Sequence, residues 1–253
     1  MKNGKNRRRA AAVDGLIQQQ ENELNIAAEI LEWEIGDLWG HVGVRLPDDR
    51  GIAVRMFRRP ERGNKEWLVR FDYSLTKLSG VGTIPRESVI YTEIFKARPD
   101  VNAAVHCHPA MCIALSLADQ PVDWVHMQSS RFSGGTPSFP RPNYILDPDE
   151  GAAVAATLGS ASAVMIKGHG IITVGATIDE ACITALYMER TAKIMAIARL
   201  HGYQGTTPES VATQAASRKK LFRRPRDEMF HSADWNYYAD KVKRGKRWTR
   251  GWT

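Results

Sequence analysis

Apolar residues recur along the chain with spacings that alternate between those of helices and those of strands. The helical spacing between residues 24 and 31 predicts a helix from about Asp14 to Ile35, ended by Gly36. Further helices are expected over Ala110–Leu117, Asp149–Leu158 and Thr177–Leu200. Short apolar runs predict strands at residues 40–46, 67–71, 163–166 and 171–174. This alternation indicates an α/β protein.

The run from Val101 to His108 alternates apolar or small residues with Asn102, Ala104 and the two histidines. A strand here would turn His106 and His108 to the same face, about 7 Å apart along the strand. Two imidazoles on one face suit a divalent metal. They are equally compatible with a polar sheet face that binds nothing.

Two further segments add candidate ligands. His169 lies between Gly168 and Gly170 at the junction of two apolar runs, where the backbone must bend. It is either a third ligand or an ordinary turn histidine. Glu87 follows Pro85, a residue suited to the start of a helix, and that helix is expected to run toward Ala97.

Together these residues form a specific pattern. Glu87, then nineteen residues to His106, then His-X-His and a later Gly-His-Gly resembles the class II aldolase/adducin family over roughly residues 20–205. The resemblance implies an α/β/α layered fold whose central, mostly antiparallel sheet is flanked by helices. It also implies that His106, His108 and His169 bind a divalent metal, with Glu87 as the acid/base. Manganese or zinc would be expected, iron or cobalt would be possible, and the family pattern implies a homotetramer with active sites between subunits.

The chain departs from the family pattern at the positions that hold phosphate in its sugar-phosphate aldolases. It has His41 where the pattern has asparagine, Gly43 where it has serine, and Pro85-Arg86 in place of Ser-Ser. A forked guanidinium suits a planar carboxylate. The pattern is therefore similar to the branch that decarboxylates hydroxylated aromatic or pyridine dicarboxylates. We expect Arg86 and His41 to bind the acidic groups of an anionic substrate, and Glu87 or His41 to protonate the ring carbon. The alternative interpretations are a surface arginine and a structural histidine.

Three other functions stay open at this point. They are an aldolase or epimerase acting on a sugar or sugar acid, a metal-free adducin-like binding module, and a nucleic-acid binder. The net charge is +7, much of it near the two ends, yet no nucleic-acid-binding motif accompanies it. No apolar stretch is long enough to span a membrane, and no signal peptide is evident. We expect a cytoplasmic protein without a nucleic-acid or membrane partner, and three unpaired cysteines.

The chain divides by composition into three parts. Residues 1–14 are expected to be a flexible basic tail, residues 15–205 the aldolase/adducin-like domain, and residues 206–253 an extension rich in aromatic and basic residues. We expect the extension to pack on a neighbouring subunit, where Tyr237 or Tyr238 could reach the pocket and contact substrate.

Overall fold

The computed structural model describes residues 2–47, 50–57, 67–221 and 227–245. Its helices are α1 (Lys2–Ile35), α2 (Val89–Ala97), α3 (Ala110–Leu117), the 3-10 helix η2 (Met127–Phe132), α4 (Pro148–Leu158), α5 (Ile178–Leu200), α6 (Pro208–Leu221) and α7 (Asp227–Lys243). Its strands are β1 (His41–Arg45), β2 (Ile52–Met56), β3 (Leu68–Phe71), β4 (Lys77–Gly80), β5 (Ala103–Cys107), β6 (Ser138–Phe139), β7 (Ala163–Ile166) and β8 (Gly170–Gly175).

In the described part of the chain, eight strands form one sheet in the order β4-β3-β2-β1-β5-β8-β7-β6. Every neighbouring pair is antiparallel except β6 and β7. The expected mostly antiparallel sheet is therefore confirmed. The exposed strand β4, which the sequence analysis did not predict, pairs with β3 at the edge of the sheet. An edge strand with all its side chains in solvent carries no apolar alternation that a pattern could detect.

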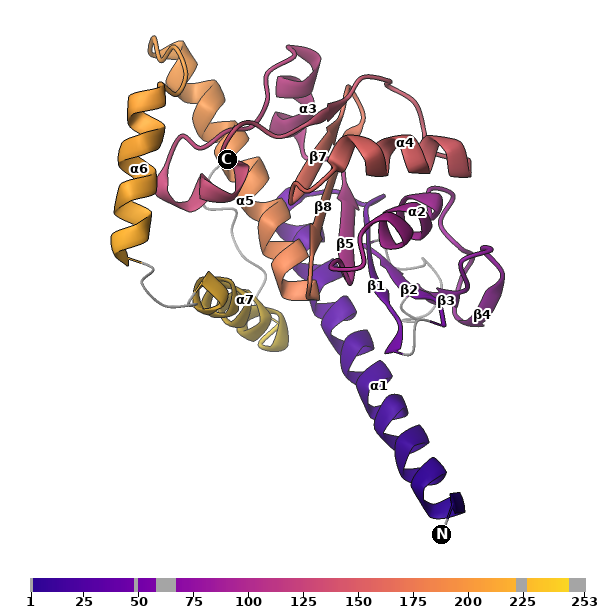
Figure 1. Ribbon diagram of the computed structural model, residues 1–253. Helices are drawn as coiled ribbons and strands as arrows, with labels where there is room; N and C mark the ends of the chain where they lie inside the picture. Colours follow the sequence, from indigo (N-terminus) through magenta and orange to yellow (C-terminus); the bar gives the residue numbers. More distant parts are fainter. Residues whose placement is uncertain (1, 48–49, 58–66, 222–226, 246–253) are drawn as a thin grey trace.

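Helices cover both faces of the sheet, and each face has its own apolar core (Figure 1). On one face α1, α3 and α5 pack against alternate residues of the central strands, among them Val105 and Cys107. On the other face α2 and α4 pack against the intervening residues, such as Ala104. With both faces covered, all five residues of β5 are buried. The three cysteines are free and buried in the first of these cores, as expected.

The N-terminal region, which was expected to be a flexible basic tail, is helical in the structure. Helix α1 begins at Lys2 instead of near Asp14, and Figure 1 shows its N-terminal part extending well away from the sheet. Alanine, arginine, lysine and glutamine dominate this part, and they are strong helix formers even without an apolar periodicity. No helix of the described residues is apolar enough over a sufficient length to cross a lipid bilayer.

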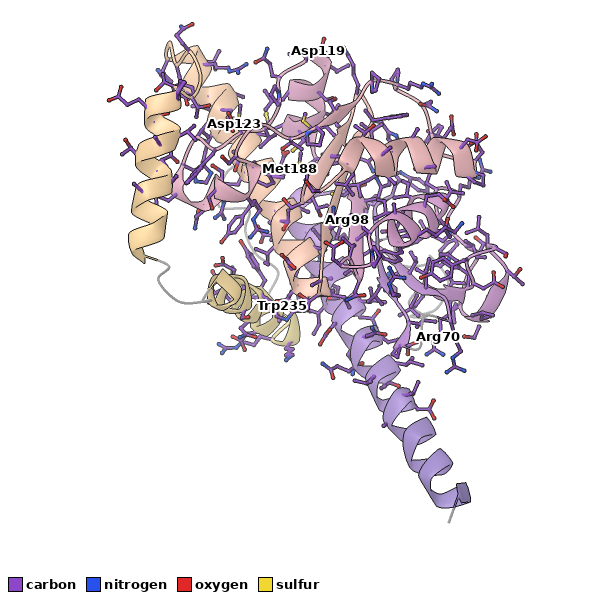
Figure 2. All side chains as sticks on the ribbon, viewed as in Figure 1. Arg70, Arg98, Asp119, Asp123, Met188 and Trp235 are labelled. Atoms are coloured by element: carbon purple, nitrogen blue, oxygen red, sulfur yellow. The ribbon has the colours of Figure 1, made fainter. Side chains whose placement is uncertain are left out.

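The C-terminal extension forms α6 and α7, whereas its residues 222–226 and 246–253 lie outside the described residues. Trp235, Tyr238 and Val242 of α7 pack against the core of their own chain. Figure 2 labels Trp235 on this helix. Tyr237 on the same helix is 57% exposed. The extension thus contacts its own domain, and its packing on a neighbouring subunit stays a prediction.

Candidate metal centre and cavity

The central strands bring the three candidate histidines together. His106 is on β5, His108 follows the end of that strand, and His169 lies in the tight turn between β7 and β8. Gly168 in this turn has a φ of 67°, a conformation that glycine adopts without steric cost. Gly170 approaches the Cys107 carbonyl so closely that a Cβ would lie 2.5 Å from its oxygen. The Gly-His-Gly sequence therefore lets the turn carry His169 to the end of β5.

Each of these histidines uses its Nδ1 atom to hold the ring in place. The Nδ1 of His106 lies 3.0 Å from the carbonyl oxygen of Ile171, and that of His169 lies 2.9 Å from the carbonyl oxygen of Asn143. The Nδ1 of His108 lies 2.9 Å from a carboxylate oxygen of Asp37. Carbonyl and carboxylate oxygens can only accept, so all three Nδ1 atoms donate, and each Nε2 atom is left to bind either a proton or a metal ion.

These Nε2 atoms converge on Glu87. The Glu87 Oε2 atom lies 3.4 Å from His106 Nε2 and 3.6 Å from His169 Nε2. One ligand atom from each of Glu87, His106, His108 and His169 lies within 4.8 Å of the others. The buried Nε2 atoms of His106 and His169 have no hydrogen-bond partner among the residues that the structure describes, which is rare for buried polar atoms. A divalent ion with ligands about 2 Å away would satisfy these atoms, so the residues fit a metal.

Glu87 lies in the turn just before α2 and is nearly enclosed, with 8% of its surface exposed. Its Oε1 atom accepts a hydrogen bond of 2.9 Å from the backbone N–H of Ile145. Burial alone would raise the pKa of Glu87, but the contacts with His106 and His169 hold that pKa well below its usual range. The side chain is therefore a carboxylate that can bind a cation or accept a proton.

Asp37 is a participant that the sequence analysis missed. Besides its bond to His108 Nδ1, its Oδ2 atom accepts the backbone N–H of His108 at 2.9 Å, and its Oδ1 atom accepts the N–H of Trp39. Burial would raise the pKa of Asp37, but the hydrogen bond and charge of His108 lower it to about 2. A carboxylate that orients a ligand histidine in this way is typical of metal centres. The only local signal is an acidic residue two positions after the end of α1.

His41 faces the same space from β1, where its Cα pairs with that of His106 across the sheet. Its Nδ1 atom lies 2.6 Å from the hydroxyl of Tyr91, and the two rings of His41 and His106 are 5.2 Å apart between centroids. Burial, together with the neighbouring His106, lowers the pKa of His41 to about 3. His41 is thus neutral and brings no positive charge to a carboxylate.

A cavity of about 720 Å³ opens beside this cluster. Its lining combines the charged and metal-site groups Asp37, His41, Arg86, Glu87, His108 and His169 with Trp39, Met56, Trp67, Thr83, Ile84, Pro85, Tyr144 and Leu146. Arg86 is the one arginine or lysine among these described lining residues, and it is exposed. The structure therefore joins His41, Arg86, Glu87 and the three histidines in one site. Tyr237 and Tyr238 are not among the described residues that line it.

The fold and the site together define a class of protein. A model of the class II aldolase and adducin N-terminal domain matches residues 33–196, and the chain belongs to this family. Among its relatives, the 3,4-dihydroxyphthalate decarboxylase of Terrabacter sp. (strain DBF63) is 25% identical over 67% of this chain and 76% of its own length. The enzyme of the same name from Arthrobacter keyseri is 26% identical over 60% of this chain and 67% of its own length.

Solved structures share the fold of this chain. The structure of L-fuculose 1-phosphate aldolase from Glaciozyma antarctica PI12 covers 94% of each chain with a TM-score of 0.76 and 21% identity. At that identity the likeness concerns the fold alone.

Proposed function

We propose that the protein is a metal-dependent decarboxylase of a hydroxylated aromatic carboxylate or dicarboxylate. The observation that carries the proposal is the cavity beside the histidine cluster, which is walled by Trp39, Trp67 and Tyr144 and offers one guanidinium. Aromatic side chains provide flat apolar surface for an aromatic ring. The two dihydroxyphthalate decarboxylases among its relatives support the same substrate class.

The proposed site uses His106, His108 and His169 to hold a divalent ion, with manganese or zinc as the candidates. Such an ion supplies a Lewis acid that stabilises negative charge on a substrate oxygen and, through it, on the ring. Glu87 is either an additional ligand of that ion or the acid/base beside it.

The remaining residues bind and orient the substrate in this proposal. Trp39, Trp67 and Tyr144 contact the ring, and Arg86 binds a carboxylate through its forked donors. Glu87 starts as a carboxylate, so it can accept the proton that a substrate hydroxyl loses. After carbon dioxide leaves, Glu87 returns this proton to the ring carbon, and the atoms balance without any further reactant.

The test is to offer hydroxybenzoates, dihydroxyphthalates and sugar phosphates with added manganese or zinc, and to measure carbon dioxide and aldehyde release side by side. We expect carbon dioxide from a hydroxylated aromatic acid, and no product from the His108→Ala variant under the same conditions. Aldehyde release from a sugar phosphate, without carbon dioxide, would overturn the proposal in favour of an aldolase. An absence of both products at full metal occupancy would favour a binding module.

A further inference from the structure

Tyr91 is a buried phenol of α2 that contacts the site and has no role in the chemistry described so far. Its hydroxyl contacts the same residue twice. It donates a hydrogen bond of 2.9 Å to the backbone carbonyl of His41 and lies 2.6 Å from the Nδ1 atom of that residue. A phenol carries one hydrogen, and here that hydrogen points to the carbonyl. The Nδ1 atom must therefore supply the second hydrogen, so His41 is protonated on Nδ1.

The other ring nitrogen of His41 then carries a lone pair. His41 lines the cavity together with Glu87 and His108, and nothing among the described residues hydrogen-bonds to its Nε2 atom. His41 Nε2 is therefore a hydrogen-bond acceptor whose orientation is fixed and to which none of the described residues donates a hydrogen bond. A ligand that brings an O–H group to this position would satisfy it.

Gly43 makes this arrangement possible. It lies two residues after His41 on β1, and successive side chains of a strand alternate, so both positions are on the same face. A Cβ on Gly43 would lie 2.5 Å from Cε1 and 2.7 Å from Cδ1 of the Tyr91 ring. No side chain larger than hydrogen fits there while Tyr91 keeps its place. The same Tyr91 side chain therefore hydrogen-bonds to His41 and fills the space that glycine at position 43 leaves open.

We propose that Tyr91 is a positioning residue that fixes His41 as a hydrogen-bond acceptor, and that His41 Nε2 recognises a hydroxyl group of the substrate. The substrate class rests on the proposed function. The tautomer and its control by Tyr91 do not depend on that function. The consequence is a preference for a hydroxylated aromatic acid over the same acid without the hydroxyl.

The tautomer can be measured directly by nitrogen NMR on zinc-loaded protein labelled with ¹⁵N-histidine. The spectrum of His41→Asn identifies the His41 signals. In the wild type we expect a protonated Nδ1 and an unprotonated Nε2 for His41. Tyr91→Phe keeps the ring that fills the space beside Gly43 and removes only the hydroxyl, so His41 should become a mixture of tautomers. Tyr73→Phe removes a tyrosine hydroxyl that accepts a hydrogen bond from Arg45 and does not line the cavity, so it should leave the signals unchanged.

The preference is measured by the binding of benzoate and of 2-, 3- and 4-hydroxybenzoate to the same zinc-loaded proteins. For the isomer whose hydroxyl reaches His41, we expect the wild type to prefer the hydroxylated acid by roughly 5- to 30-fold. Tyr91→Phe should lose most of that preference and Tyr73→Phe should keep it. A wild-type His41 protonated on Nε2 would overturn the proposal, as would a Tyr91→Phe variant with an unchanged tautomer or unchanged preferences for all three isomers. Failure of the turnover assays with these results intact would instead overturn only the proposed function.

Discussion

The buried, neutral His41 predicts a measurable dependence of stability on pH. In the folded protein the pKa of His41 is lowered from 6.5 to about 3, mainly by burial. Below pH 6.5 His41 therefore binds a proton in the unfolded chain but not in the folded protein. The free energy of unfolding consequently decreases as the pH falls toward 3. At pH 5 this effect amounts to one and a half pH units at about 1.4 kcal/mol each, or about 2 kcal/mol. The figure requires only that the folded pKa is below 5.

His41→Asn is the matched variant for this measurement. The asparagine amide can still donate to the Tyr91 hydroxyl, but it does not titrate. We expect urea unfolding in the presence of a chelator to show that the wild type loses about 2 kcal/mol more than the variant between pH 7.5 and pH 5. Other buried histidines, such as His106, are present in both proteins, so the difference isolates His41. Equal losses in the two proteins would refute a neutral His41.

Four further substitutions address the other groups of the site. Glu87→Gln should reduce turnover by at least 100-fold with the metal content unchanged, as measured by elemental analysis, whereas loss of metal would identify Glu87 as a ligand. Arg86→Ala should raise the KM for dicarboxylates about tenfold or more with little change in kcat, and an unchanged KM would remove its assigned role. Asp37→Asn should weaken metal affinity by roughly 10- to 100-fold in a competition titration, because the ligand histidine that it orients loses a charged partner. Glu150→Ala should weaken metal affinity several-fold, because Glu150 hydrogen-bonds to Asn143 and Leu146, and the Asn143 carbonyl orients His169. Asp149→Ala, which changes the exposed neighbouring residue, is its control.

Most of the fold could be predicted where local pattern and tertiary structure agree. Helices α3, α4 and α5 lie close to their expected positions because they bury apolar residues at helical spacing, and strands β5, β7 and β8 do so because short, mostly apolar runs are buried on both faces of the sheet. The buried strand β2 was not predicted, and the pattern also failed at two segments that carry no apolar periodicity. The fully exposed strand β4 is held by its backbone pairing with β3, and the first part of α1 contains helix-forming residues without an apolar periodicity.

The residues of the candidate site could likewise be predicted only in part. His106 and His108 could be identified because they are two residues apart in one strand pattern, and His169 because glycines flank it between two apolar runs. Asp37 and Tyr91 could not, because their roles arise from hydrogen bonds to residues 71 and 50 positions away. These two hydrogen bonds depend on how the strands and helices assemble, and no periodicity in the surrounding sequence predicts them.

The charges of the assembled site give the proposed substrate preference a physical basis. Asp37 and Glu87 are carboxylates with lowered pKa values, and His41 is neutral. With the proposed divalent ion bound, the two carboxylates balance its charge, so this cluster offers little net attraction to a second acidic group of a substrate. Arg86 is then the remaining positive group among the described lining residues. A dicarboxylate should therefore depend on Arg86 more strongly than a monocarboxylate does, and the ratio of the two KM changes in Arg86→Ala measures that dependence directly.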